Sequence, residues 1–257
     1  MTGLVEIRPI PAFRDNYIWM LSRDGDAVVV DPGDSAPVHA ALRQHRIKLT
    51  GILVTHHHGD HVGGVAELAE AYRARVWGPA RETIPSRQVA LREGDTVEVL
   101  GQQFTVIDIP GHTLGHIALY APSIDALMCG DTLFTCGCGR LFEGTAAQMF
   151  ESLSKLARLP DSTSVYCGHE YTLSNIRFAR TVEPDNAELA RRQLDCEQLR
   201  SRGEPTVPST IAQERATNPF LRCTEPTLRA AAERRVPGAG SDPVATFAAV
   251  RAWKDEF

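Results

Sequence analysis

One short segment of this chain, residues 56–61, carries an unusual density of metal-ligand side chains directly after an apolar run that is typical of a buried strand. It contains His56, His58, Asp60 and His61, and imidazole nitrogens and carboxylate oxygens are the usual ligands of catalytic zinc, iron or manganese. Residues two apart on extended backbone point to the same side, so we expect His56 and His58 to serve one ion. Asp60 and His61 follow a glycine, where the chain can turn, and are expected to serve a second ion.

Three further ligand-type residues, His112, Asp131 and His169, each follow an expected strand and stand next to a glycine. His116, which also stands next to a glycine, is a fourth candidate. The ends of strands are where α/β proteins commonly place their sites. Spacing alone leaves these residues open between metal ligand and ordinary polar residue. The two histidines of an expected amphipathic helix at residues 35–45 are interpreted as surface residues.

The hydrophobic pattern predicts short strands with a few helices over the first two-thirds of the chain, and helices after about Tyr171. Asp24-Gly25 is typical of a hairpin turn, and the T-A-A-Q sequence at residues 145–148 has the form of a helix capping box. The expected strands cover residues 17–21, 27–30, 51–55, 96–100, 104–109, 117–120, 126–129 and 164–167. The expected helices cover residues 35–45, 65–72, 145–159, 172–182 and 187–202, with a last one opened by Asp242-Pro243 and proline-punctuated loops before it.

Composition narrows the class of protein. The 257 residues carry a formal net charge of −5, which argues against a nucleic-acid partner because phosphate binding usually needs a basic face. No apolar run approaches the roughly 20 residues that span a bilayer, and the N-terminal residues lack the pattern of a secretory leader. The six scattered cysteines are expected to be reduced thiols, so we expect a cytoplasmic protein. We also expect no membrane partner and a monomeric state, although the residues themselves carry no pattern for the latter.

The metal segment resembles the H-x-H-x-D-H motif of the metallo-β-lactamase superfamily, and the chain as a whole resembles its glyoxalase II branch, the hydroxyacylglutathione hydrolases. The resemblance runs from near the N-terminus almost to the end of the chain. The matching segments are FRDNY (13–17), VDPG (30–33), THHHGDHVGG (55–64), PGHTLGH (110–116), GDTLF (130–134), CGR (138–140), FEGT (142–145), GHEYT (168–172) and NPF (218–220).

The resemblance implies an α+β fold, a four-layer αββα sandwich with a smaller C-terminal all-helical domain. The catalytic domain would cover residues 1–170 and the helical substrate-binding domain residues 171–257. The resemblance also implies a ligand set, in which His56, His58 and His112 hold one ion, Asp60, His61 and His169 hold the other, and Asp131 bridges both. Asp60 and Asp131 would then be the catalytic carboxylates, with His116 and Asp31 supporting the ligands from behind.

The family reaction is the hydrolysis of S-D-lactoylglutathione to D-lactate and glutathione, a step of methylglyoxal detoxification. It implies two divalent metal ions per subunit, with zinc expected and iron or manganese also compatible with the ligands. A pair of ions lowers the pKa of a bound water and polarises the thioester carbonyl, so the attacking group is a metal-activated hydroxide. No G-x-S-x-G nucleophile motif occurs in the chain.

The resemblance also implies residues that bind the glutathione part of the substrate: Arg140, Phe142, Tyr171, Arg251 and Lys254. Phe142 departs from the family pattern, in which a tyrosine is common, so one hydrogen bond to the substrate is expected to be missing. Without the resemblance, Arg251 and Lys254 would be interpreted as a solvated cation pair at the C-terminal end of a helix, where positive charge is favoured.

Several alternatives stay open on the sequence. Another enzyme of the superfamily, such as a persulfide dioxygenase, a lactonase or a β-lactamase, is the leading one. A metallo-nuclease and a binding protein that has lost catalysis are two others. The Cys136-x-Cys138 pair could indicate a redox or soft-metal site, but the nitrogen and oxygen ligands already account for the metals.

Overall fold

The structure is a computed structural model that describes residues 3–257. The expectation that the chain opens without a leader concerns residues 1–2 as well, which lie outside the described residues. The chain divides into two compact units, Met1–Asp108 with Gly115–Gly130 and Ile109–Leu114 with Asp131–Phe257. Between residues 3 and 257, no helix combines the length and the apolar character that crossing a membrane requires.

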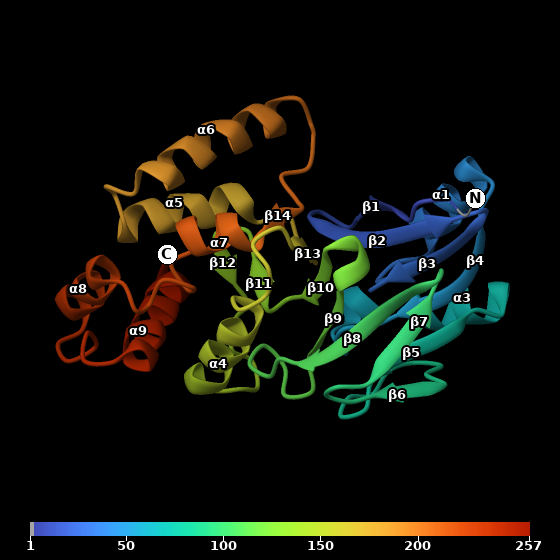
Figure 1. Ribbon diagram of the computed structural model, residues 1–257, viewed down its shortest axis with the longest axis horizontal. Coiled ribbons are helices and arrows are strands. Elements are labelled where there is room, and N and C mark those ends of the chain that lie inside the picture. Colours follow the sequence, from blue (N-terminus) through green and yellow to red (C-terminus); the bar gives the residue numbers. More distant parts are fainter. Residues whose placement is uncertain (1–2) are drawn as a thin grey trace. The chain divides into compact units, whose positions relative to one another are not determined.

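The first unit contains a sheet with the strand order β1-β2-β3-β4-β5-β6 (Figure 1). Its first three strands are antiparallel, and the strands from β3 to β6 run parallel. The predicted hairpin at Asp24-Gly25 is confirmed between β2 and β3. The strands are β1 (Glu6–Ala12), β2 (Asn16–Arg23), β3 (Asp26–Val30), β4 (Lys48–Leu53), β5 (Arg75–Pro79) and β6 (Val89–Leu91).

Helices α1 (Ser35–His45) and α3 (Val65–Tyr72) make the crossovers that parallel strands require, and both match their predicted bounds. Their apolar residues join those of the sheet in one buried cluster that includes Val38, Leu68 and Ile52. Between β4 and α3 lies a single helical turn, α2 (Gly59–Val62), which contains Asp60 and His61, while His56, His57 and His58 lie just before it. The ligand-type residues are therefore placed between a buried strand and a packed helix.

A second set of strands in the first unit forms an antiparallel meander of β7 (Thr96–Val99), β8 (Gln102–Asp108), β9 (Ile117–Ala121) and β10 (Ala126–Gly130). Strand β2 is buried on both faces, as in a sandwich, since Met20 packs on the helix side while Trp19 and Leu21 point the other way and are also buried. The amide of Ile117 donates to the carbonyl of Thr55, which links the start of β9 to the end of the β4 segment.

The second unit carries most of the remaining helices (Figure 1). Helix α4 begins with the predicted capping box, in which Thr145 and Gln148 satisfy each other's backbone amides. The last helix begins at Pro243, with Asp242 as its N-cap, as predicted. The elements are β11 (Leu133–Phe134), β12 (Gly137–Cys138), α4 (Ala146–Leu156), β13 (Ser164–Cys167), α5 (Thr172–Val182), α6 (Ala187–Ser201), β14 (Ser209–Thr210), α7 (Ile211–Thr217), α8 (Pro226–Arg235) and α9 (Pro243–Glu256).

The expectation of loops before the last helix is wrong at α7 and α8. Helix α7 opens with a second capping box, Thr210 with Gln213, and α8 has Pro226 at its first position. Proline is well tolerated at the first turn of a helix, where its missing N–H would have no helical partner. In this region a capping box therefore marks the start of α7, and a proline marks the start of α8.

Candidate metal centre

The ligand turn, which we define as residues 55–64, is fixed against the neighbouring loop by close backbone contact. A Cβ atom at Gly33 would strike the carbonyl of Asp60, and one at Gly63 would lie 2.5 Å from the carbonyl oxygen of Gly33. Only glycine allows backbones to approach this closely. The glycines at these positions therefore set where Asp60 and the following histidine lie.

Asp31 orients two of the histidines in this turn. Its carboxylate accepts hydrogen bonds from the amide of Thr55 (2.7 Å), from the Thr55 hydroxyl (2.6 Å) and from Nδ1 of His61 (3.1 Å). Because the Thr55 hydroxyl donates to Asp31, its oxygen is the acceptor for Nδ1 of His56 at 3.1 Å. Both rings thus carry their proton on Nδ1, which leaves Nε2 as the nitrogen suited to a metal ion.

Within the second unit, Asp131 lies between two histidines. Its Oδ2 is 3.5 Å from Nε2 of His112 and 3.3 Å from Nε2 of His169. Nδ1 of His112 donates to the carbonyl of Arg140 at 2.9 Å, so this ring also presents Nε2. One carboxylate oxygen faces two imidazole nitrogens, which is the arrangement expected of a bridging ligand.

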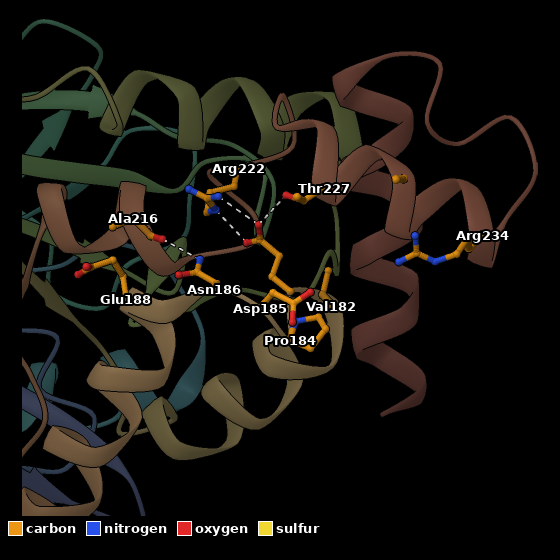
Figure 2. A pocket seen from close by; sticks show the side chains of 11 residues that line it. Val182, Pro184, Asp185, Asn186, Glu188, Ala216, Arg222, Thr227 and Arg234 are labelled. Carbon is orange, nitrogen blue, oxygen red and sulfur yellow. Dashed lines mark hydrogen bonds and ion pairs between the residues drawn. The ribbon is translucent and has the colours of Figure 1, made fainter.

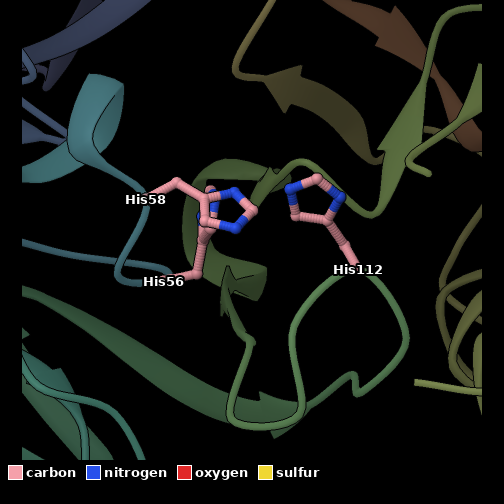
Figure 3. A group of neighbouring side chains, drawn as sticks. All are labelled: His56, His58 and His112. Carbon is pink, nitrogen blue, oxygen red and sulfur yellow. The ribbon is translucent and has the colours of Figure 1, made fainter. Parts of the chain in front are cut away.

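Three groups of side chains bring their ligand atoms within 4.8 Å of one another. The first group is drawn in Figure 3. The groups are His56 with His58 and His112, Asp60 with His61 and His169, and Asp31 with His56 and His61. Six of the seven residues expected as ligands fall in the first two groups, and Asp131 contacts a histidine of each.

These residues fit divalent metal ions by their chemistry. Neutral imidazoles and carboxylates are the ligands that zinc, iron and manganese share, and three donors per ion leave positions for water or substrate. Four of the five histidines in the first two groups, His56, His61, His112 and His169, are buried, and His58 is half-buried. The third group is a weaker candidate, because the Asp31 oxygens already accept three hydrogen bonds.

Neighbouring side chains support the turn. The Asn16 amide donates to Oδ2 of Asp60 at 2.9 Å. His57 is directed to Glu82, with 3.0 Å between Nδ1 and Oε2, and belongs to none of the three groups. The ring of His116 stacks on that of His56, with centroids 4.5 Å apart, and its Nδ1 donates to the carbonyl of Ile117.

Two of the residues expected to bind substrate place their rings against the histidines of the second unit, and a third, Arg140, is paired with an acid. The Tyr171 ring stacks on His169 with centroids 4.6 Å apart, and the Phe142 ring meets His112 edge to face at 5.3 Å. Phe142 is 63% exposed, so its ring is accessible to a ligand. The exposed Arg140 side chain pairs with Asp255 at 3.2 Å.

The two cations of helix α9 differ in their surroundings. Arg251 is only 4% exposed, and it donates to the carbonyl of Cys138 at 2.9 Å and to Asp255 at 3.1 Å. Lys254 is half-buried over the rings of Phe178 and Phe257. Burial, and then the positive charge of Arg251, lowers the pKa of Lys254 to about 8.

A pocket of about 630 Å³ lies elsewhere in the second unit, among α5, α6, α7 and α8 (Figure 2). Its buried acid, Glu183, accepts two hydrogen bonds from Arg222 and one from Thr227. Asn186 at its edge donates to the carbonyl of Ala216. Its buried polar groups are therefore engaged with one another, and none of the expected site residues lines it.

The cysteines take no part in this chemistry. All six are buried thiols. Burial raises the pKa of Cys136 to about 12 and that of Cys138 to about 11, so neither is a thiolate at neutral pH. The alternative of a redox or soft-metal pair is not supported by these surroundings.

Sequence reasoning missed two supporting residues, Asn16 and Thr55. Each stands inside a segment that carried the family resemblance, but neither has the imidazole or carboxylate group of a usual metal ligand. A search for hydroxyl and amide neighbours of the histidine segment would have found Thr55. Asn16 lies 44 residues before Asp60 and needs the fold to reveal it.

Known proteins resemble this chain over its whole length. The profile described as "Metallo-beta-lactamase superfamily" matches residues 12–169, and the profile "Hydroxyacylglutathione hydrolase C-terminus" matches residues 170–257. A protein of Alkalilimnicola ehrlichii named hydroxyacylglutathione hydrolase is 57% identical, with 98% of this chain and 100% of that protein covered. A protein of the same name from Pseudomonas aeruginosa is 55% identical, with 99% and 100% covered.

A solved structure titled as TTHA1623 in a di-iron-bound form is also similar, with a TM-score of 0.60 and 28% sequence identity over 83% of this chain and 100% of that one. The fold is that of the superfamily, α+β, with a helical C-terminal domain. Taken with the geometry of the histidine and aspartate groups, these likenesses mean that the chain belongs to the hydroxyacylglutathione hydrolase family of the metallo-β-lactamase superfamily.

Proposed function

We propose that this protein is a thioester hydrolase that cleaves S-D-lactoylglutathione to D-lactate and glutathione. The observation that carries the proposal is the full-length identity of 57% and 55% to proteins named hydroxyacylglutathione hydrolase. The grouped histidines and aspartates supply the donors that such a reaction needs. In the reaction, a water oxygen adds to the thioester carbon, the carbon–sulfur bond breaks, and the sulfur leaves with its electron pair as the glutathione thiolate.

We assign the ligands of two ions as the family resemblance implies. His56, His58 and His112 would hold one ion and Asp60, His61 and His169 the other, with Asp131 between them. Zinc is the proposed metal, and iron is compatible, as the di-iron relative illustrates. When bound, the ions supply positive charge that acidifies a water molecule and polarises the thioester carbonyl.

The chain's own residues orient and hold the reacting groups. Asn16 fixes the Asp60 carboxylate in one orientation, so that it can accept a hydrogen bond from the attacking water. Three acceptors keep three histidines in the tautomer that presents Nε2: the Thr55 hydroxyl for His56, the Asp31 carboxylate for His61 and the Arg140 carbonyl for His112. A thiol with an ordinary pKa of about 8.5 leaves as a thiolate without a strong general acid.

We assign glutathione recognition to Arg140, Phe142, Tyr171, Arg251 and Lys254. The two cations of α9 suit the carboxylates of glutathione, and the stacked Tyr171 offers a flat apolar surface beside His169. Within the described residues, the buried Nε of Arg251 has no hydrogen-bond acceptor, which supports a role in holding an anionic group. His116 and Asp31 support the ligands and do not contact the substrate in this proposal.

We further propose that residues 1–170 act as the catalytic domain and residues 171–257 as the substrate-binding domain. The two matching family profiles meet at residues 169 and 170, which supports this division. We also propose that the protein is located in the cytoplasm and that it is a monomer. Gel filtration coupled to light scattering would test the monomeric state.

The direct test is a steady-state assay of the purified protein on S-D-lactoylglutathione, following loss of the thioester absorbance. We expect saturable turnover with release of one free thiol per thioester cleaved. Parallel assays with glutathione persulfide in an oxygen electrode, with a lactone and with a β-lactam cover the other activities of the superfamily. Oxygen uptake without thioester cleavage would overturn the proposal in favour of a dioxygenase.

A further inference from the structure

The hairpin of β11 and β12, residues 133–138, is an isolated two-stranded ribbon whose backbone is buried. Leu133 pairs with Cys138 and Phe134 with Gly137, and no further strand extends this sheet among the described residues. Two-stranded hairpins are marginally stable on their own, and buried backbone groups need hydrogen-bond partners. Partners must therefore come from outside the hairpin.

Side chains of the C-terminal helices and their flanking residues provide these partners. Four side chains satisfy five backbone groups of the hairpin. The Asn218 amide donates to the carbonyls of Phe134 (3.0 Å) and Gly137 (2.9 Å), the Asn175 amide to that of Thr135 (3.0 Å) and the Arg251 guanidinium to that of Cys138 (2.9 Å), while Glu214 accepts from the Cys136 amide (2.9 Å).

Asn218 is the centre of this arrangement. It is fully buried, and the two hydrogens of its amide are shared among three acceptors, the two hairpin carbonyls and Oε2 of Glu214 at 2.9 Å. Its own oxygen accepts from the Phe220 amide, which fixes the side chain's orientation. Arg192 neutralises the buried Glu214 through a 2.6 Å hydrogen bond. A buried network satisfied in this way has one low-energy arrangement.

The hairpin in turn connects two parts of the candidate metal centre. Asp131 lies just before it and Arg140 just after it, and the Gly139 amide closes the base of the hairpin onto the Thr132 carbonyl at 3.2 Å. A Cβ at Gly139 would strike the Asp131 carbonyl, so the two ends are in close contact. The Arg140 carbonyl accepts the Nδ1 proton of His112. The position of the hairpin therefore sets both the Asp131 backbone and the His112 tautomer.

We propose that Asn218, together with Glu214, is a positioning residue for the metal centre, which acts through the backbone of the β11–β12 hairpin on Asp131 and His112. The proposal rests on the proposed function, since it assumes the ligand assignments made there. It gives a role to the Asn218-Pro219-Phe220 segment, which is distant from the ligands in sequence and carries no ligand-type side chain.

The test compares Asn218→Ala with a matched control, Asn186→Ala. Asn186 also donates to a backbone carbonyl and accepts from a backbone amide in the second unit, but it has no contact with the hairpin among the described residues. Thermal unfolding, Zn²⁺ affinity by chelator competition, and kcat and KM are measured for both. We expect both variants to lose thermal stability, Asn218→Ala more because Asn218 is fully buried, while Asn218→Ala alone loses roughly 10- to 100-fold in Zn²⁺ affinity, because support of a ligand is worth about that much.

A milder variant, Asn175→Ala, removes one hairpin contact and keeps the experiment decisive if Asn218→Ala does not fold. It is expected to weaken Zn²⁺ binding in the same direction by a smaller factor. Equal Zn²⁺ affinity of the hairpin variants and of Asn186→Ala would overturn the proposal and leave a purely structural role. Failure of the proposed function would give a different result from failure of this proposal. It would appear as absent thioester cleavage by the unmodified protein, and the Zn²⁺ affinities of the variants could still be compared.

Discussion

At the scale of single residues, the site depends on which ring nitrogen each histidine presents. Asp31 and Thr55 impose the Nδ1 tautomer on His56 and His61. The spacing of the histidines predicted them as ligands, because residue type and alternation are local features. The carboxylate that orients them lies 24 residues from Thr55 in the chain, and only the family resemblance pointed to it.

Asp131 is the residue whose loss should be most damaging. Replacing it by Ala removes the carboxylate oxygen that faces both His112 and His169. We expect Asp131→Ala to bind less metal and to lose more than the roughly 10- to 100-fold in kcat that outer supporting residues contribute. Metal analysis and steady-state kinetics of the same preparation measure both effects. The surface variant Asp195→Ala is the control, and equal metal content and kcat in the two variants would refute the bridging assignment.

The cations of α9, which the sequence presents as an equivalent pair, have different roles in the structure. Arg251 is buried and bound to Cys138 and Asp255, so its replacement would disturb packing as well as binding. Lys254 is more accessible and has a pKa lowered to about 8. It is the cleaner residue for a binding experiment.

We expect the KM for an anionic glutathione thioester to rise as the pH increases through about 8. Below that pH Lys254 carries a positive charge that attracts the substrate carboxylates, and above it the side chain becomes neutral. The variant Lys254→Arg stays charged, because an arginine pKa lies above about 12. Initial rates from pH 6.5 to 9.5 measure KM for both proteins, and an identical pH dependence of KM in the two would exclude Lys254 from binding.

At the scale of elements, local patterns predicted the helices α1 and α3 to the residue and most strands within a few residues. They missed β1, β5, β6 and the two-residue strands β11, β12 and β14. At β1, Pro9 and Pro11 argue against a strand. The structure places β1 at the edge of its sheet, where a residue without an N–H is tolerated. Edge position is a property of the whole sheet, so the segment itself could not reveal it.

The close contact between the Gly33 loop and α2 gives a prediction for these elements. We expect Gly33→Ala to destabilise the fold by about 1–3 kcal/mol, the usual cost of forcing extra atoms into a packed site. It should also lower metal content, since the added Cβ displaces the Asp60 backbone. Gly59→Ala, inside the ligand motif, is the control, because a Cβ there meets nothing within 4 Å. Chemical denaturation and metal analysis would detect the difference, and equal stability of the two variants would contradict it.

At the scale of the whole molecule, the candidate site is assembled from residues more than a hundred positions apart in sequence. The residues themselves left His112, Asp131 and His169 undecided, because convergence is a result of tertiary packing that no local pattern contains. Only the resemblance to a family indicated, from the sequence, that these three residues are metal ligands. The hairpin support by Asn218 and Glu214 was missed for the same reason, since it joins buried polar groups 78 to 84 residues apart.

The central claim is that the seven imidazole and carboxylate ligands bind two ions on which thioester cleavage depends. It is tested most directly by removing metal with a chelator, restoring Zn²⁺ stepwise, and measuring bound metal and S-D-lactoylglutathione turnover at each step. We predict that stripped protein is inactive and that turnover returns as binding approaches about two ions per chain. Full turnover by protein that contains almost no metal would contradict the account.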